Sequence, residues 1–455
     1  MASHKVDTKS EHDSRPPTAK TMIDRDEEKG VDAPSDGKEP ASGDSPAGNT
    51  FPIPDGGWRA WSVVFGCALV LFSTFGYVNA FGVYQAYYSQ HLGKSDSVIS
   101  WIGSFQLWML FALGPPVGKL FDEGYCRHLI AVGSLIYVFS LFMLSITKNQ
   151  YYQVFLAQAL GTGLGSGLLF LPATSVISHW FSRRRAYAVG IVIAGSSLGG
   201  VIFPIMLNNL IVQIGFASAV RATSYLILGC LVIANILIAP RLPPRRLRPP
   251  SMQMPPPDMK RILTHRAYQI AVLGGFFMTW GFFMPFFYLQ VYAQSRGIEE
   301  NLAFYSLSIL NAASIFGRVL PNFLADKTGP FNMIIPFSFS TAVLLFGWLG
   351  VTTRAGLVMF ALLYGFFSGA FISLLPSCFM TLAFNVGEMG IRVGIGYIGT
   401  AFAGLTGTPI AGALLGDELQ WWKPTVFSGI SVFAGTALLI LARHLHAKEK
   451  GTWKV

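Results

Sequence analysis

Residues 180–200 read WFSRRRAYAVGIVIAGSSLGG, which places a cluster of three arginines directly before an apolar, glycine-rich run. The run after Arg183, Arg184 and Arg185 exceeds the roughly 20 residues that a membrane-spanning helix needs. Of the 455 residues, 52% are hydrophobic and 12% are charged, whereas soluble domains carry about 25% charged residues. The stretch is therefore predicted to be a transmembrane helix whose arginines anchor one end in the interface.

The same pattern recurs along the chain, where apolar segments alternate with short polar breaks. Each segment is long enough to cross about 30 Å of hydrocarbon. A proline-rich basic stretch at 240–258 divides the segments into two sets of six. We predict an all-α membrane protein in a lipid bilayer, with twelve transmembrane helices near 61–84, 98–118, 128–147, 152–178, 186–210, 220–240, 268–293, 302–322, 332–352, 355–380, 391–416 and 424–444.

The basic residues gather in alternate loops, and cytoplasmic loops carry the excess of Lys and Arg. The richer loops are therefore predicted to be cytoplasmic, with both termini on that side. The cell membrane is the default location and the vacuolar membrane is the alternative. The richer set holds Lys119, Arg127, Arg183–Arg185, seven basic residues at 241–266, Lys327, Arg392, Arg443, Lys448, Lys450 and Lys454; the poorer set holds Lys94, Lys148, Arg221, Arg296, Arg354 and Lys423.

The two sets of six segments match at a constant offset of 204 residues. This register predicts two pseudo-symmetric six-helix bundles, an arrangement found in transporters of the major facilitator type, where solutes bind between the halves. It pairs Asp122 with Asp326, Leu120 with Leu324, Gly161 and Gly165 with Gly365 and Gly369, Leu171-Pro172 with Leu375-Pro376, and Gly190, Gly195 and Gly200 with Gly394, Gly399 and Gly404. Small residues on such helices allow close contact, either for sliding or for static packing.

Several function classes are excluded by the sequence. The net charge of +10 comes from residues between apolar segments, so no nucleic-acid partner is expected. Gly195-Ser196-Ser197-Leu198-Gly199 fits a nucleophile motif, but it lies within an apolar helix instead of a strand–turn–helix. The four cysteines form no CxxC pair. We expect no catalytic residues, no metal and no cofactor, and therefore no enzyme.

Two features inside the spans suggest a solute path. Arg318 lies within the eighth span, where a charge costs about 2.5–3.5 kcal/mol and usually faces the interior; snorkelling or pairing with Asp326 is the alternative. The seventh span contains FFMTWGFFMPFFYLQVY at 276–292, in which Pro285 is expected to open the helix. Trp280 and Tyr288 are candidates to line a cavity, although packing and lipid contact explain most of these rings.

Residues 54–61, PDGGWRAW, open the first span, and Asp55, Gly56, Gly57 and Trp58 resemble a signature of the monocarboxylate porter family of the major facilitator superfamily. The loop with Arg183–Arg185 resembles the second signature of that family, and the proline-rich linker and acidic tail resemble its fungal branch. The resemblance covers residues 52–446. It implies secondary active transport by alternating access, often of a carboxylate together with a proton.

Two positions depart from the family. Its well-studied members carry a lysine late in the first span, where this chain has Asn79, and an acid one turn before the arginine of the eighth span, where this chain has Ser314. Arg318 retains the planar fork that receives a carboxylate. Lactate–proton symport is therefore not expected, and a larger organic acid, a vitamin-like compound or a secondary metabolite is favoured, with export as one direction.

The leading hypothesis is a secondary transporter of a small organic solute, with or without a proton. Its substrate-binding candidates are Arg318, Asn79, Trp280, Tyr288 and Asn311, while Asp122 and Asp326 act as loop latches. The alternative is a solute-sensing receptor that signals through its N-terminal tail. The expected divisions are a disordered cytoplasmic tail at 1–51, bundles at 52–240 and 267–446, a linker at 241–266 and a C-terminal tail at 447–455. The sequence leaves the oligomeric state open.

Overall fold

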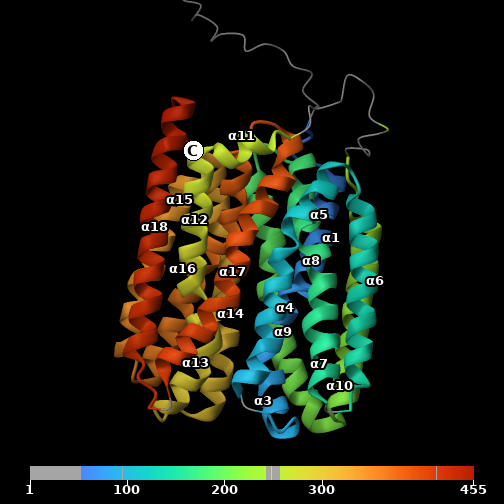
Figure 1. Cartoon of the computed structure of the whole chain (residues 1–455), viewed down its shortest axis with the longest axis vertical. Coiled ribbons are helices and arrows are strands. Elements are labelled where there is room, and N and C mark those ends of the chain that lie inside the picture. The colour runs from blue at the N-terminus through green and yellow to red at the C-terminus, as the bar shows by residue number, and fades with distance from the viewer. Residues whose placement is uncertain (1–52, 95, 149, 242–246, 248–256, 417) are drawn as a thin grey trace, which may run out of the picture. The chain divides into compact units, whose positions relative to one another are not determined.

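The structure is a computed structural model that describes residues 53–94, 96–148, 150–241, 247, 257–416 and 418–455. Every regular element in these ranges is helical, and twelve helices are long and apolar enough to cross a membrane (Figure 1). The predicted fold class is therefore confirmed. The tail predicted at 1–51 and most of the linker predicted at 241–266 lie outside the described residues.

The first half of the fold holds six spans, several of them built from more than one helix. The first span is interrupted at Thr74 and again at Asn79 and Ala80, and the second is interrupted at Leu113 before two prolines. The elements are α1 (Trp58–Ser73), α2 (Phe75–Val78), α3 (Phe81–His91), α4 (Asp96–Ala112), α5 (Gly114–Asp122), α6 (Cys126–Ser145), α7 (Tyr151–Val154), η1 (Phe155–Thr162), α8 (Gly163–Ser175), η2 (Val176–His179), α9 (Arg185–Ile214) and α10 (Phe216–Leu237).

The second half holds the remaining six spans and begins with a short helix before them. Its first span breaks at Phe283, and Pro285 lies in the first turn that follows, where a missing N–H is tolerated. The elements are α11 (Met259–Thr264), α12 (Arg266–Phe282), α13 (Met284–Ser295), α14 (Glu300–Thr328), α15 (Pro330–Gly347), η5 (Trp348–Gly350), α16 (Arg354–Thr381), η6 (Val386–Glu388), α17 (Met389–Leu415) and α18 (Trp422–Lys450).

The 204-residue offset reappears in the helix boundaries. α4 and α14 begin at residues 96 and 300, α6 and α15 at 126 and 330, and α9 and α17 at 185 and 389. The helix breaks at Asn79 and Phe283 are also 204 residues apart. The two halves are therefore copies of one bundle, although the domain limits of 52–240 and 267–446 stay a prediction.

The two halves meet along two related pairs of helices, α9 with α14 and α17 with α5. At Gly190 an added Cβ would lie 2.8 Å from Cβ of Asn322 on α14, and at Gly114 an added Cβ would lie 2.9 Å from Cα of Gly394. Only glycine permits these approaches, as the small-residue pattern of the fifth span predicted. The contacts between the halves are therefore partly backbone to backbone.

We call the end of the bundle that carries Asp55, Asp122, Arg183–Arg185 and Asp326 the basic side, and the opposite end the far side. In Figure 1 the basic side, with α11, is at the top, and the far side, with α3 and α13, is at the bottom. Several helices extend beyond their predicted spans: the first continues to His91 and the last to Lys450. Helical hydrogen bonding continues in the interface after the apolar run has ended.

Candidate solute site

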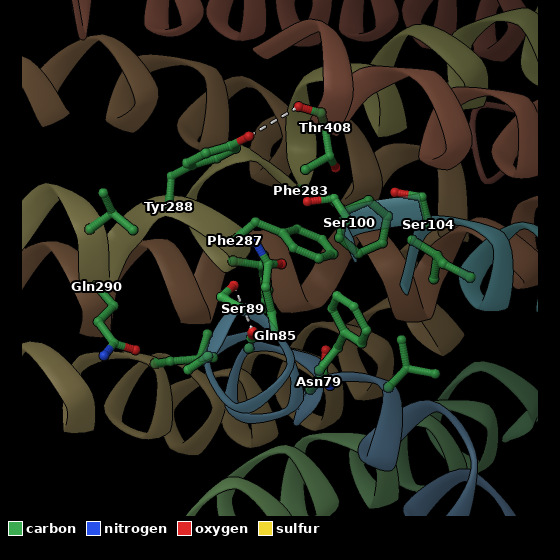
Figure 2. Close-up of a pocket in the computed structure, with 18 of the residues that line it drawn as sticks. Asn79, Gln85, Ser89, Ser100, Ser104, Phe283, Phe287, Tyr288, Gln290 and Thr408 are labelled. Carbon is green, nitrogen blue, oxygen red and sulfur yellow. Dashed lines mark hydrogen bonds between the residues drawn. The ribbon is translucent and has the colours of Figure 1, made fainter. Parts of the chain in front are cut away.

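A cavity of about 460 Å³ lies between the two halves toward the far side (Figure 2). This volume is within the range of small-molecule sites. Its walls come from α2, α3 and α4 of the first half and from α13, α14 and α17 of the second. The lining residues are Phe75, Val78, Asn79, Phe81, Gly82, Gln85, Ala86, Ser89, Ser100, Ser104, Leu107, Phe283, Phe286, Phe287, Tyr288, Gln290, Val291, Gln294, Glu300, Leu307 and Thr408.

The cavity wall is aromatic and polar but almost uncharged. Among the described residues that line it, Glu300 is the only charged side chain, and it stands at the first residue of α14 on the far side. The hydroxyl of Tyr288 donates to the carbonyl of Thr408 at 3.3 Å, which fixes this ring against α17. The wall therefore suits a solute with apolar surface and neutral polar groups.

The breaks in the first spans of each half bring polar and aromatic groups to the cavity. Asn79 follows the four-residue helix α2, and Phe283 separates α12 from α13. An unbroken helix would keep its side chains on a regular stripe, whereas each break turns the next segment relative to the last. Asn79 and Phe283 both line the cavity.

The predicted binding residues fall into two groups. Asn79 and Tyr288 lie on the cavity wall. Arg318, Asn311 and Trp280 are not among the described residues that line it. Nε1 of Trp280 donates to Oγ1 of Thr406 at 3.1 Å, and the ring packs at 5.0 Å from that of Phe427 on α18, within the second half. A binding role for Trp280 would require another conformation.

Arg318 ties the two halves together in this structure. Its side chain is 1% exposed. Nη1 donates to the carbonyl of Ile193 at 2.8 Å and to the hydroxyl of Ser196, both on α9, and Nε donates to Oγ of Ser314 at 3.1 Å. The guanidinium therefore faces the protein interior, and neither snorkelling nor the predicted alternative of pairing with Asp326 describes it.

The two sequence signatures meet at the basic side. One carboxylate oxygen of Asp55 accepts from the backbone N–H groups of Ser182 and Arg183, at 2.6 and 2.7 Å. Asp55 has φ of 53°, and Gly57 has φ of 91° and precedes α1 directly. Trp58 is 90% exposed, a position that suits an interfacial aromatic anchor. Asp55 of the first signature therefore binds the loop that forms the second signature.

The three arginines of this loop differ in their surroundings. Arg183 and Arg184 are exposed and Arg185 is half-buried. Nε of Arg185 donates to the carbonyl of Phe181 at 3.4 Å. The arginines thus stand before and at the start of α9, and their role as an interfacial anchor stays a prediction.

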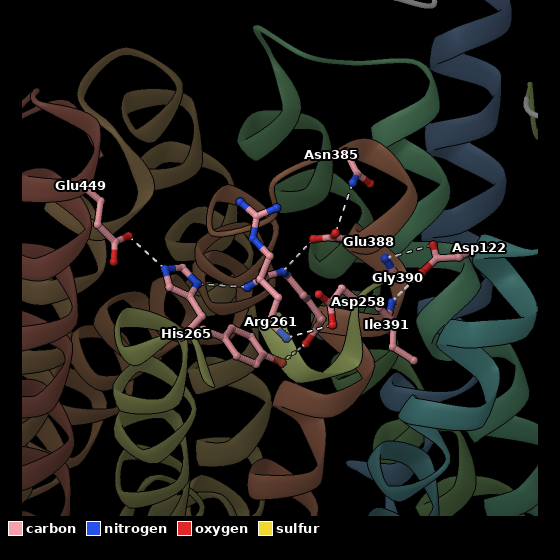
Figure 3. A network of polar contacts seen from close by, with 11 residues as sticks. Asp122, Asp258, Arg261, His265, Asn385, Glu388, Gly390, Ile391 and Glu449 are labelled. Atoms are coloured by element: carbon pink, nitrogen blue, oxygen red, sulfur yellow. Dashed lines mark hydrogen bonds and ion pairs between the residues drawn. The ribbon is translucent and has the colours of Figure 1, made fainter. Parts of the chain in front are cut away.

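The paired aspartates Asp122 and Asp326 each bind the helix start of the opposite half. The carboxylate of Asp326, at the end of α14, accepts from Ala186 N–H at 2.8 Å and Tyr187 N–H at 2.9 Å on α9. The carboxylate of Asp122, at the end of α5, accepts from Gly390 N–H at 3.2 Å and Ile391 N–H at 2.8 Å on α17 (Figure 3).

All three positions of each contact are related by 204 residues. A carboxylate also interacts favourably with the positive end of a helix dipole. Two equivalent clamps therefore join the halves at the basic side, while the latch role of the two aspartates stays a prediction.

A polar network in the second half was missed from the sequence. Arg392, which we assigned to a loop, is fully buried in the first turn of α17. It contacts Oε2 of Glu388 at 3.4 Å and Nδ1 of His265 at 3.2 Å, while Nε2 of His265 lies 2.9 Å from Glu449 (Figure 3). A single loop arginine carries no sequence signal for such burial. The network joins the starts of α12 and α17 to the end of α18.

Most residues of the cavity wall were also not predicted from the sequence, although the 204-residue repeat indicated some of them. Tyr288 is 204 residues after Tyr84, and both follow a helix break. Applied to the whole aromatic span, the offset indicates Phe283 as the equivalent of Asn79.

No group of three His, Cys, Asp or Glu side chains is placed to hold a metal in the described ranges.

Comparison with known proteins gives a consistent picture. The family model of the Major Facilitator Superfamily matches residues 66–403. The chain is 43% identical over 404 residues to the Aspyridones efflux protein apdF of Emericella nidulans, covering 88% of this chain and 81% of that protein. It is 40% identical over 397 residues to the MFS transporter asaE of Aspergillus flavus, covering 86% of this chain and 88% of that protein.

Solved structures share the fold at low sequence identity. The human organic anion transporter MFSD10 (TETRAN) aligns with a TM-score of 0.66 at 14% identity, over 84% of this chain and 99% of that chain. FucP in its outward conformation aligns with a TM-score of 0.66 at 15% identity, over 84% and 98%.

Proposed function

The chain belongs to the Major Facilitator Superfamily and is a multi-pass membrane transporter, and from this premise we propose that it exports a small organic metabolite by alternating access. The observation that carries the proposal is the cavity between the halves, together with the clamps that hold the basic side closed. The relative apdF, 43% identical, is named an efflux protein for aspyridones. A secondary metabolite is therefore the favoured solute class.

The proposed orientation places the basic side in the cytoplasm, because Lys and Arg mark cytoplasmic loops. Both termini then lie in the cytoplasm, and the far-side cavity faces outward from the cell membrane. In this orientation the structure corresponds to the state that releases solute. The other state would open between α9 and α14 on the cytoplasmic side, after the contacts of Asp122 and Asp326 with the opposite half have broken.

Arg318 has a proposed role in loading the solute. In this structure its guanidinium is occupied by Ile193 and Ser196 of the opposite half. When α9 and α14 separate, those two acceptors leave, and an acidic group of the solute could replace them through charge-assisted hydrogen bonds. When α9 and α14 close again, Ile193 and Ser196 of α9 accept from the guanidinium once more. The solute then passes to the nearly uncharged outer cavity. Competition for one side chain would thus couple release to closure.

We also propose membership of the monocarboxylate porter branch, on the basis of PDGGWRAW at 54–61, the arginine loop and Arg318. Proton symport through the arginine and its partner is not part of the proposal. Ser314, which accepts from Nε of Arg318, has no proton that titrates near neutral pH. The solute, rather than a proton on this pair, would neutralise the arginine.

The test of export is untargeted metabolite profiling of cells with and without the gene, inside and outside, at two external pH values. We expect one or a few organic compounds to accumulate inside the deletion strain and to fall in the medium. A gradient that does not change with external pH would argue against proton coupling. Unchanged metabolite levels on both sides of the membrane would contradict export.

The loading role of Arg318 is tested in proteoliposomes with the compound so identified. Arg318→Ala should lower transport at least about 100-fold if the lost pair is charged and desolvated. Arg221→Ala is the matched control, because Arg221 is exposed on α10 and binds the carbonyl of Ala217 in its own helix. Wild-type transport by Arg318→Ala would refute the loading role.

A further inference from the structure

We propose that Asn79 and Asn311 form a recognition site for the cis-amide edge of a lactam, a group that presents an N–H donor and a carbonyl acceptor side by side. The inference rests on the proposed function, since it takes the cavity between the halves as the solute site. It adds a substrate class to that site.

The two side chains offer one donor and one acceptor that no other group in the described part of the chain uses. Nδ2 of Asn79 and Oδ1 of Asn311 are both buried and have no hydrogen-bond partner among the described residues. Nδ2 of Asn311 donates to the carbonyl of Leu307 at 3.0 Å, so the oxygen is the free atom of that amide. A buried polar atom left unpaired costs free energy that a partner would recover.

The free donor and the free acceptor lie against the same glycine. A Cβ added to Gly200 on α9 would lie 2.8 Å from Oδ1 of Asn311 and 3.0 Å from Nδ2 of Asn79. The amides come from opposite halves, Asn79 from the end of α2 and Asn311 from α14. A ligand that binds both therefore bridges the halves.

The pair stands at the inner end of the cavity. Asn79 lines the wall (Figure 2). On α14, Glu300 and Leu307 line it in turn, and Asn311 follows one helical turn deeper. Arg318 lies about 10 Å further along the same helix. A solute that leaves Arg318 during export therefore passes the amide pair before it reaches the rest of the cavity.

The second half provides an internal comparison. The positions 204 residues from Asn79 and Gly200 are Phe283 and Gly404, and the position 204 residues before Asn311 is Leu107. An added Cβ on Gly404 would lie 3.3 Å from Leu107, so the equivalent contact exists and is apolar. Helix packing at this crossing therefore does not require the asparagines.

The chemistry of the pair favours a lactam over an ion. An ionised carboxylate only accepts hydrogen bonds and would place negative charge beside Oδ1 of Asn311, while an ammonium only donates and would leave Nδ2 of Asn79 unpaired. A cis-amide edge satisfies both atoms at once. Leu107, Phe283 and Phe287 line the same cavity and would pack on the apolar part of the molecule.

The test measures binding of three probes to the full-length protein in nanodiscs: 2-quinolone, N-methyl-2-quinolone and 2-naphthoate. The first is a lactam, the second lacks its donor, and the third is a carboxylate of similar size. Because an analogue that leaves a buried polar group unpaired is strongly rejected, wild type should bind 2-quinolone at least about 10-fold more tightly than its N-methyl form. Binding of 2-naphthoate, which the loading role places at Arg318, should not change in a variant of the amide pair.

Two variants and a matched control isolate the site. Asn311→Leu copies the residue found at the equivalent position, Leu107, and should reduce the preference to within about 2-fold; Asn79→Ala should do the same. Asn209→Leu is the control: its amide also binds the carbonyl four residues earlier, at 2.9 Å, but it is exposed on α9. This variant should keep the wild-type preference.

Equal binding of the lactam and its N-methyl form by wild type would overturn the proposal, as would a preference that survives in Asn311→Leu. Binding of 2-naphthoate that weakens in Asn311→Leu, or no saturable binding of any probe, would also overturn it. None of these results would alter the metabolite profile of the deletion strain, so failure of the lactam site and failure of the export function can be told apart.

Discussion

At the scale of single residues, Asp55 links the segment before α1 to the loop before α9. It is one of two non-glycine residues with positive φ in the described part of the chain, and its carboxylate holds two backbone N–H groups of the loop before α9. Asparagine tolerates this backbone conformation better than most residues do. Comparing two substitutions can therefore separate the backbone from the carboxylate.

We expect Asp55→Asn to lower stability by about 1 kcal/mol, through loss of the charge-assisted bonds. Asp55→Ala should lower it further, because it adds strain at positive φ. The midpoint of thermal unfolding in detergent measures both. Equal midpoints for Asp55→Ala and wild type would show that the loop does not depend on this carboxylate.

Gly200 is the second residue for which the structure makes a sharp prediction. In Gly200→Ala the new Cβ would press on both amides of the proposed lactam site, at 2.8 and 3.0 Å. We expect transport of the identified solute to fall about 10-fold with little change in folding. Gly229→Ala is the control, since among the described residues no heavy atom beyond the adjoining backbone of its own helix lies within 4 Å of the added Cβ. A similar effect of both substitutions on transport would contradict this prediction.

At the scale of elements, the contact of α5 with α17 should control opening of the basic side. A Cβ at Gly394 would lie 2.6 Å from the carbonyl carbon of Gly114 and 3.1 Å from N of Pro115. Gly394→Ala should therefore force the two helices apart. We expect faster maleimide labelling of Ser377→Cys, which is 2% exposed in this structure, in a cysteine-free background. Slower or unchanged labelling would mean that this contact does not hold the closed state.

The elements also show what sequence could and could not predict. Apolar runs predicted all twelve spans, because lipid imposes both length and composition. The breaks within the spans were harder to predict from the sequence. Pro285 signalled the break at Phe283, but those around Thr74 and Asn79 have no proline. The sequence gives no sign of a local role for Thr74. In the structure its Oγ1 donates to the carbonyl of Val70 at 2.7 Å.

At the scale of the whole molecule, the two clamps should act together on alternating access. Asp122→Asn with Asp326→Asn should weaken both contacts at the basic side. We expect labelling of Ser377→Cys at that side to rise several-fold, while labelling of Ser100→Cys, in the far-side cavity, falls. The matched single variants should give intermediate values, because each leaves one clamp in place. A rise at both ends would indicate unfolding rather than a shift between two states.

The long-range contacts mark the limit of the sequence. The offset identified Asp122 and Asp326 as equivalent, yet it could not tell which groups they bind, since the partners are 268 and 140 residues away. The charge within the eighth span and the family resemblance likewise named Arg318 and Asn79 without placing them. Arg318 lies off the cavity because α9 supplies acceptors that only the folded chain brings near it.

The clamps have a consequence for how the two bundles can change. Each aspartate accepts from two main-chain amides of the facing helix. Amino-acid replacements at the receiving positions therefore leave these four hydrogen bonds in place, provided that the helix still starts at the same residue. Chimaeras that join one bundle of this transporter to the opposite bundle of a relative should still close at the basic side. The residues that line the cavity, and with them the choice of solute, can differ between such relatives.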